Sequence, residues 1–333
     1  MDISRMTRRR ALTIFAATAA GLVAGGSRPE TADYEWRGYA MGTDARIIFS
    51  GASHQASRSA AELAAVEIER LERALSLFRS DSEIARLNRD GVLPAPTGDM
   101  LRAVGLAVEV ADATDGLFDP TVQALWEAYV DWFSTSRNQE IPPQHLIARA
   151  LQAVDWRQIK LADDSIVIGK GQRITLNGLG QGYVTDRVAN LLRHRGFNNV
   201  LVDLGEQRAL GPNRDGSPWL VGRRGRPRIE LSDGALATSE GVGCILGANG
   251  AVHHLFDPRT GRSSHRWQTI TVHHHSAAVA DALSTAAYCA SGDEIKNLVR
   301  KFDGLIVWAT DHSGRENRWE SAIRPIGVKS HMG

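Results

Sequence analysis

Hydrophobic residues recur at helical spacing in several stretches of this chain. In the clearest case, Ala64, Ile68, Leu71 and Leu75 lie three or four positions apart, which predicts a helix over 59–78 with one apolar face. Ser80 and Glu83 form a capping-box pattern that predicts a short helix ending near residue 88. Further helices are predicted over 100–114, from the Pro142-Pro143 pair to about 154, over 183–195 and over 278–290.

Short apolar or alternating runs separate these helices and indicate strands. They are predicted at 45–49, 159–161, 165–168, 173–177, 200–203 and 305–309, with several glycine-punctuated strands between 203 and 272. Helices and strands are mixed rather than strictly alternating, which favours an α+β fold with antiparallel sheet. No low-complexity linker divides the chain, so residues 28–333 are expected to form one unit.

Residues 1–27 have the form of an export signal. Arg8-Arg9-Arg10 precedes a mildly apolar run that ends in small residues at 24–26. The paired arginines, with Thr7 before them and Leu12 after them, are typical of a twin-arginine signal peptide, and an ordinary secretory signal is the alternative. We therefore expect a soluble periplasmic protein whose first partner is the twin-arginine export machinery.

Composition narrows the classes of protein. The formal charges nearly cancel, with 39 Lys and Arg against 38 Asp and Glu, whereas proteins that bind nucleic acid normally carry a cationic excess. No run approaches 18 apolar residues of high hydropathy, which argues against an integral membrane protein. Two cysteines, Cys244 and Cys289, are too few for a cysteine zinc module, and a disulfide between them stays open.

A glycine-rich turn, Gly178-Leu179-Gly180-Gln181-Gly182, lies between a predicted strand and a predicted helix. Backbone N–H groups at such a helix start suit a phosphate group. Asp203 follows the next strand, where a dinucleotide-binding fold places an acid, so a dinucleotide-dependent oxidoreductase is one hypothesis. The G-x-G-x-G spacing and the lack of repeated strand–helix units speak against it, and a plain tight turn is the structural alternative.

Asp281 and Thr285 are four residues apart on a predicted helix and therefore share a face. A carboxylate and a hydroxyl are hard oxygen ligands suited to Mg²⁺. By itself the pair is weak, because both residue types are common on helices for other reasons.

Two similar turns carry Asp-Pro, at 116–121 and 254–261, and hint at an internal duplication; turn formation is their first interpretation. Six of the eleven histidines fall within 253–275. Neighbouring residues of a strand face opposite ways, so His273-His274-His275 is a poor transition-metal site. His253 and His254, just before the second turn, are better candidates for contact with a ligand.

Together these segments resemble the FAD:protein FMN transferase (ApbE) family, over about 38–292. The resemblance rests on Met41-Gly42-Thr43, Phe78 with Asp81-Ser82-Glu83-Ile84 and Leu87-Asn88, Phe118-Asp119-Pro120-Thr121-Val122, 177–183 with Asp186, Val202-Asp203-Leu204-Gly205, Ala237-Thr238-Ser239, His254 with Asp257-Pro258-Arg259-Thr260-Gly261, and 280–285. The form of 176–186, with the export signal, is similar to the periplasmic, NosX-like branch linked to nitrous-oxide reductase.

The resemblance implies an ApbE-like, T-fold-like architecture and a reaction. FAD is split at its pyrophosphate with Mg²⁺, AMP leaves, and FMN is esterified to a Ser or Thr hydroxyl of an acceptor flavoprotein with a periplasmic FMN domain. It further implies Gly178, Asp281 and Thr285 as the metal ligands. The expected contacts to the flavin or adenine are Met41, Phe78, Leu117, Phe118, Asp119, Thr175 and Gln181. His254 and Asp257 are expected to orient or deprotonate the hydroxyl.

The sequence departs from the family pattern at several positions. The family usually has an acid at the position of Thr175 and a Lys or Glu at that of Gln181, and Gly205-Glu206-Gln207 and Thr238-Ser239-Glu240 also differ. A catalytically impaired flavin carrier or assembly factor is therefore the second hypothesis.

Overall fold

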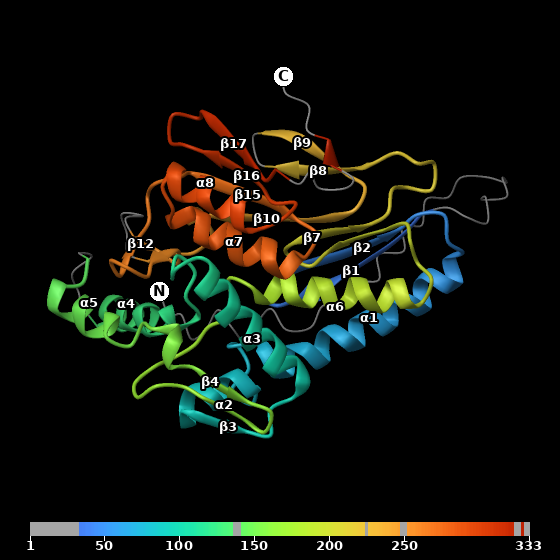
Figure 1. Ribbon diagram of the computed structural model, residues 1–333. Helices are drawn as coiled ribbons and strands as arrows, with labels where there is room; N and C mark the ends of the chain where they lie inside the picture. The colour runs from blue at the N-terminus through green and yellow to red at the C-terminus, as the bar shows by residue number, and fades with distance from the viewer. Residues whose placement is uncertain (1–32, 136–140, 224–225, 247–251, 323–327, 330–333) are drawn as a thin grey trace.

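The computed structural model describes residues 33–135, 141–223, 226–246, 252–322 and 328–329. An eight-stranded sheet, antiparallel at every neighbouring pair, forms its centre (Figure 1). In spatial order the strands are β1 (Tyr34–Ala40), β2 (Thr43–Phe49), β6 (Val200–Asp203), β7 (Gln207–Leu210), β10 (Gly234–Glu240), β15 (Thr269–His274), β16 (Ile306–Thr310) and β17 (Glu316–Glu320). The predicted α+β class is confirmed, and an antiparallel centre rules out the doubly wound sheet that the oxidoreductase hypothesis needs.

Both faces of the sheet are covered, because successive side chains of a strand point to opposite sides. In β6, Val200 and Val202 join the large core, while Leu201 joins a second cluster on the other face. Four helices cover the first face: α1 (His54–Leu75), α6 (Gly180–His194), α7 (Ala277–Cys289) and α8 (Gly292–Lys301) (Figure 1). The other face packs against a small sheet of β8 (Trp219–Arg223), β9 (Arg226–Leu231) and β18 (Val328–Lys329).

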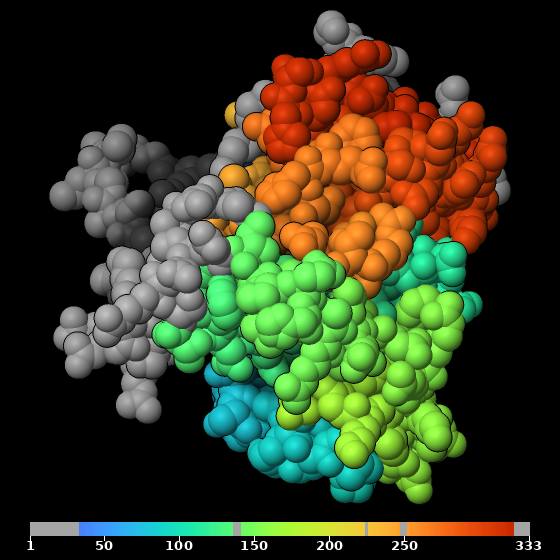
Figure 2. All heavy atoms as spheres, turned by 90° about the vertical axis from the view of Figure 1, so that its left-hand side faces the viewer, coloured from blue at the N-terminus to red at the C-terminus, as the bar shows by residue number. Residues whose placement is uncertain are grey.

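Two smaller assemblies flank this centre. One contains α2 (Glu83–Asp90), α3 (Gly98–Ala113), η3 (Trp156–Gln158) and the sheet β3 (Val92–Pro94), β5 (Ser165–Val167) and β4 (Lys160–Ala162). The other, here called the side lobe, contains η2 (Pro120–Val122), α4 (Gln123–Thr135), α5 (Gln144–Leu151), η4 (Gly241–Gly243), and the hairpins of β11 (Ile245–Leu246) with β12 (Val252–His253) and β13 (Phe256–Asp257) with β14 (Arg262–Ser263). The side lobe has its own apolar cluster, and Figure 2 shows its face, with α4 and α5 in green below the orange hairpin residues.

Several predicted elements agree with the structure. β6 begins and ends where the sequence predicts, and α7 and β16 each differ from their predicted ranges by one residue. Helix α1 begins five residues earlier than expected, because Ser53 caps it by accepting a hydrogen bond from the Ala56 N–H.

The predicted strand at 173–177 is wrong. This segment forms no strand, although Ile174 is fully buried. The Asn88 side chain takes the place of a partner strand: its Nδ2 donates to the Ile174 carbonyl (2.8 Å) and its Oδ1 accepts from the Ile174 N–H (2.7 Å). Next to it the Thr175 N–H donates to the Pro120 carbonyl (2.7 Å). The backbone polar groups are thus satisfied without a sheet.

Two predicted helix starts need correction. Helix α2 is capped by Ser82, not Ser80, and the Glu83 carboxylate accepts from the Thr97 N–H (2.9 Å) rather than closing a capping box. Helix α6 begins at Gly180, three residues before the predicted start. Helices α4 and α8 were not predicted, although Ser291 and Glu294 form a capping box at the start of α8.

None of the described helices is long and apolar enough to cross a bilayer. Cys244 is exposed, Cys289 is buried, and both thiols are free, which answers the question of a disulfide.

Candidate active site

A cavity of about 900 Å³ is lined by residues of the side lobe, of the start of α6 and of the middle of α7. One part of it is apolar and aromatic, with Leu77, Phe78, Leu117, Phe118, Trp126, Leu255 and Phe256. The other part is polar, with Gln181, Glu206, Gln207, Arg223, Thr238, Ser239 and Glu240. Gly178, Asp281 and Thr285 also line the cavity. A cavity of this size and mixed character suits an elongated ligand with an aromatic end and a polar end.

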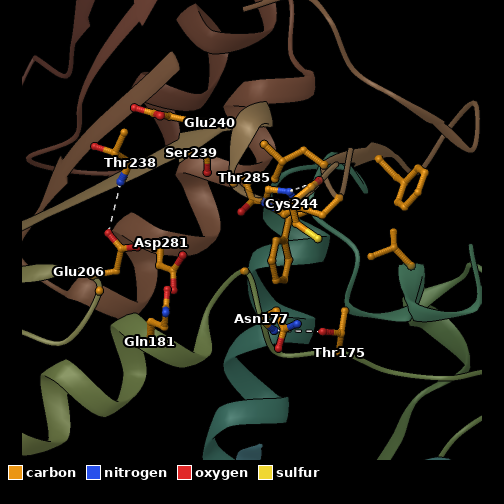
Figure 3. A pocket seen from close by; sticks show the side chains of 18 of the residues that line it. Thr175, Asn177, Gln181, Glu206, Thr238, Ser239, Glu240, Cys244, Asp281 and Thr285 are labelled. Atoms are coloured by element: carbon orange, nitrogen blue, oxygen red, sulfur yellow. Dashed lines mark hydrogen bonds between the residues drawn. The ribbon is translucent and has the colours of Figure 1, made fainter. Parts of the chain in front are cut away.

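Asp281 and Thr285 are brought to the cavity by α7 (Figure 3). The Asp281 carboxylate is buried, and its Oδ2 accepts a hydrogen bond from the Gly182 N–H at the start of α6 (3.1 Å). Thr285 lies one helical turn further on and faces the same cavity. Asp281 and Thr285 therefore lie on the same face of α7, as their spacing predicts.

Close approach of backbone explains two glycines of the predicted turn. A Cβ at Gly182 would lie 2.2 Å from the Ala277 carbonyl oxygen, so α6 and α7 could not pack as they do with any larger residue. A Cβ at Gly178 would lie 2.9 Å from Thr285 Oγ1 and 3.3 Å from the Phe118 ring. The backbone of residue 178 therefore lies directly beside the Thr285 hydroxyl.

The site holds a buried carboxyl pair. Burial raises the pKa of Asp281 to about 7, although the Gly182 N–H opposes this. Burial, together with the nearby charge of Asp281, raises the pKa of Glu206 well above its usual range, and the Thr238 N–H donates to Glu206 Oε2 (3.3 Å). Desolvation disfavours two adjacent negative charges, so the pair gains from a cation that lies between or beside its oxygens.

Gln181 lies beside this pair in Figure 3. Its amide group rests against Gly205, where a Cβ would lie 2.8 Å from Gln181 Cδ. Gly205 has a positive φ of 106°, which suits glycine and lets the amide approach the backbone. Thr175, on the far side of the glycine turn, accepts from the Asn177 N–H through its hydroxyl (3.1 Å).

The turn with Leu117, Phe118 and Asp119 lines the apolar part of the cavity. The Asp119 carboxylate accepts hydrogen bonds from the N–H (2.8 Å) and hydroxyl (2.6 Å) of Thr121, and burial raises its pKa. The Asp119 side chain therefore stabilises the turn and also lines the cavity. Phe78 also lines the cavity and is 72% exposed, so its ring is accessible to a ligand.

His254 lines the cavity, whereas His253 lies behind it. His254 Nδ1 lies 3.4 Å from the Cys244 carbonyl oxygen. In the tautomer with the proton on Nδ1 the ring donates to this oxygen, and Nε2 has a lone pair. Partial desolvation by the surrounding protein lowers the pKa of His254, although the residue keeps an exposed part. His253 is buried, and burial lowers its pKa to about 4. Both imidazoles are therefore neutral near pH 7.

Two of the expected site residues lie outside the cavity lining. Asp257 is engaged by the Arg259 guanidinium (2.7 and 2.9 Å), within the turn that follows His254. Met41 donates its N–H to Glu72 Oε1 (2.6 Å), and its Cε would lie 3.3 Å from a Cβ at Gly180. It thus packs behind the glycine turn. The other ten expected residues all line the cavity.

The structure adds lining residues that the sequence did not indicate, among them Trp126, Arg223 and Cys244. Arg223 is paired with Glu316 (2.6 Å) and lies over the Trp308 ring. Trp126 belongs to α4, which was itself not predicted. These positions depend on how distant elements pack, and no local pattern marks them.

The donor set around Gly178, Asp281 and Thr285 consists of oxygens only. In the part of the chain that the structure describes, no group of three or more His, Cys, Asp or Glu is placed to hold a metal ion. The oxygen set therefore suits a hard cation such as Mg²⁺ with phosphate oxygens and water as further ligands. An oxygen cluster of this kind beside aromatic side chains has the chemistry to accept a ligand that carries both phosphate groups and a ring system.

Comparison with known proteins gives the family. The profile of the ApbE family matches residues 41–308, and the chain belongs to this family. One curated relative is the FAD:protein FMN transferase of Vibrio cholerae, which is 28% identical over 66% of this chain and 69% of its own length. Another is the FAD:protein FMN transferase of Escherichia coli K12, which is 25% identical over 83% of this chain and 84% of its own length.

Solved structures agree in fold. The ApbE protein of Thermotoga maritima superposes with a TM-score of 0.76 and 27% identity, covering 87% of this chain and 97% of that one. The Pseudomonas stutzeri flavinyl transferase ApbE gives a TM-score of 0.73 at 22% identity, over 89% and 98%. The family and the fold expected from the motifs are confirmed.

Proposed function

We propose that this protein is an FAD:protein FMN transferase that moves FMN from FAD to a Ser or Thr hydroxyl of an acceptor flavoprotein and releases AMP. The observation that carries the proposal is the oxygen cluster of Gly178, Asp281 and Thr285 in a cavity that has an aromatic part and a polar part. FAD has the matching form, with a flavin and an adenosine joined by a pyrophosphate. The names of the curated relatives support the same reaction.

Mg²⁺ fits the residues present. A Cβ would fill the space between Gly178 and the Thr285 hydroxyl, and the buried Asp281 carboxylate uses only Oδ2 in a hydrogen bond from a described residue. We propose the Gly178 carbonyl, Asp281 and Thr285 as its protein ligands. When bound, Mg²⁺ would act as a Lewis acid that neutralises pyrophosphate charge.

The protein's own side chains would orient the reactants. Phe78, Leu117 and Phe118 would hold the flavin, while Asp119 fixes the turn that carries two of them. Thr175 and Gln181 would contact the polar portion of FAD through neutral hydrogen-bonding groups, and Met41 would support the glycine turn from behind. Phosphoryl transfer depends chiefly on such positioning.

His254 is the proposed base for the incoming hydroxyl. Its neutral imidazole, with the proton on Nδ1, can take the hydroxyl proton at Nε2 as the oxygen attacks phosphorus. Asp257 would act indirectly, since its pairing with Arg259 fixes the turn next to His254.

The carrier or assembly-factor hypothesis is favoured by one feature, which is that neither Thr175 nor Gln181 can bring a charge to the cavity. Purified protein incubated with FAD, Mg²⁺ and an FMN-binding acceptor domain distinguishes the two functions. The transferase is expected to release AMP and to leave flavin fluorescence on the acceptor in a denaturing gel. Flavin binding without either product would reject it in favour of the carrier.

We further propose that residues 1–27, which lie outside the described residues, direct export to the periplasm by the twin-arginine route. The motif around Arg8 and Arg9 supports this route. The resemblance of residues 176–186, together with this signal, to the NosX-like branch supports a membrane-bound acceptor of nitrous-oxide respiration. A fusion reporter that still reached the periplasm after Arg8→Lys and Arg9→Lys would contradict the twin-arginine route.

A further inference from the structure

The side lobe presents an open strand edge beside the cavity. Strand β11 pairs with β12 alone among the described strands. The His254 N–H donates to the Cys244 carbonyl (3.1 Å), so the opposed residues Ile245 and His253 form a non-hydrogen-bonded pair. The N–H and C=O of Ile245 therefore point away from β12, toward the open edge. Neither group makes a hydrogen bond to a described residue.

The side chains along this edge are apolar and exposed. Val242, in η4 just before β11, is 63% exposed, and Ile245 of β11 is 47% exposed. Leu246, on the other face of the strand, is buried in the apolar cluster of the side lobe. None of the residues 241–246 is charged, and none is proline. Exposed edge strands usually carry charges or proline that prevent pairing with another chain. An apolar edge without them is suited to adding a strand from a partner.

The edge is directly connected to the reaction site. Gly243 and Cys244, which precede β11, line the cavity together with His254. The Cys244 carbonyl accepts from the His254 N–H and lies 3.4 Å from its Nδ1. Ile245 directly follows these two lining residues, so an extended segment paired with Ile245 would lie next to the cavity wall.

We propose that this edge, defined by Val242 and Ile245 with the outward backbone groups of Ile245, docks the acceptor protein. The occupant is an extended segment of the acceptor with apolar residues near its Ser or Thr hydroxyl. The inference rests on the proposed function, because a transferase must bring a protein hydroxyl to a cavity that also holds FAD. Strand addition supplies both affinity through the backbone and a fixed register for the hydroxyl.

Kinetics with an FMN-binding acceptor domain test the docking edge. Ile245→Ser and Val242→Ser are each expected to raise the apparent KM for the domain about tenfold, as for central residues of an interface. Neither side chain lines the cavity, so the Kd for FAD, measured by flavin fluorescence, is expected to stay within about twofold. Val66→Ser is the matched control, because Val66 is 67% exposed on α1, and Ile245→Val is expected to restore the low KM.

The native cysteines give a second test that needs no variant. Cys244 is exposed beside the edge, while Cys289 is buried and burial raises its pKa to about 12, so a maleimide should label Cys244 alone. An acceptor domain whose hydroxyl is replaced by alanine is expected to slow the labelling of FAD-loaded protein about tenfold at saturation.

The outcomes separate the two proposals. If the wild-type protein transfers FMN but both serine variants keep its acceptor KM, or the alanine domain leaves labelling unchanged, the docking edge is wrong. If the wild type transfers no FMN to any acceptor domain, the proposed function fails and the docking edge with it. If the wild type is a dimer that Ile245→Ser converts to a monomer, the occupant is a second copy of the chain and not the acceptor.

Discussion

At the scale of single residues, the candidate site depends on two neighbouring carboxyl groups in the wall of the cavity. The Asp281 carboxylate is buried beside Glu206, and burial raises the pKa of both. Such a pair does not contribute to folding through its charge; in the absence of a cation it costs free energy. A buried carboxyl pair that costs folding free energy and lines a cavity points to a role in binding, which substitution can test.

Asp281→Ala is expected to leave the fold intact and to lower Mg²⁺-dependent FMN transfer at least about a hundredfold, because the charge stabilisation that a metal supplies is worth several kcal/mol. AMP release over a Mg²⁺ titration, with circular dichroism of the same sample, measures both. Thr285→Ser retains the hydroxyl and is the matched control, whereas Thr285→Val should behave like Asp281→Ala. Unchanged transfer by Asp281→Ala would refute the assigned site.

At the scale of elements, one side chain joins the two helices that form the site. Asp186 of α6 accepts hydrogen bonds from the Ser276 hydroxyl (2.6 Å) and from the N–H groups of Ala277 (2.9 Å) and Ala278 (3.2 Å), and it pairs with Arg208. It therefore caps α7 from outside that helix. Since Gly178 precedes α6 and Asp281 lies on α7, this contact fixes the distance between the proposed metal ligands.

Asp186→Asn is expected to destabilise the protein by about 2 kcal/mol, because the amide loses the charge that faces both the helix start and Arg208. It is also expected to raise the Mg²⁺ concentration needed for half-maximal transfer. Urea unfolding and a Mg²⁺ titration check the two effects. Asp215→Asn is a suitable control, since Asp215 holds only a local turn at Ser217. If Asp186→Asn changed stability no more than Asp215→Asn, the capping role would be rejected.

The same contact shows how far the sequence could predict the elements. Helical periodicity located α1, α3, α6 and α7 to within five residues at each end, because this signal is local. The strand predicted at 173–177 failed because the partner of its backbone is Asn88, which is 86 residues from Ile174. Helix α4 was not predicted, although Leu125 and Tyr129 are four residues apart and pack together in the apolar cluster of the side lobe.

At the scale of the whole molecule, the cavity collects residues from segments between Leu77 and Thr285. The resemblance to the ApbE family, which rests on several motifs in a fixed order, implied ten of these lining residues. Trp126, Arg223 and Cys244 could not be found in that way, because their place is set by the packing of the side lobe and of β8 on the sheet. The open edge of β11 likewise becomes visible only from its register with β12.

Three helices that support the cavity meet at one buried carboxylate. Asp99, in the first turn of α3, accepts hydrogen bonds from Arg70 of α1 (2.6 Å), from Arg102 (2.8 Å) and from the Tyr183 hydroxyl of α6 (2.7 Å). Arg187 of α6 lies 3.3 Å from the same carboxylate. Burial of Asp99 opposes its ionisation, but the hydrogen bonds from Arg102, Arg70 and Tyr183 outweigh this and lower its pKa to about 2.

This lowered pKa predicts how stability depends on pH. An aspartate in the unfolded chain has a pKa of about 3.9, so the folded state favours the charged form of Asp99. Its contribution is fully present above about pH 4 and is lost as the pH falls from 4 to 2. We expect the charge of Asp99 to contribute about 1 to 2 kcal/mol to the free energy of unfolding, a value discounted because the arginine partners are partly exposed.

Asp99→Asn should therefore lower the free energy of unfolding by that amount at pH 6, and the difference should shrink toward pH 2. Urea titrations at pH 6, 4 and 3 measure it, with the exposed Asp163→Asn as control. A difference that stayed constant over this range would show that Asp99 acts through packing and not through its charge.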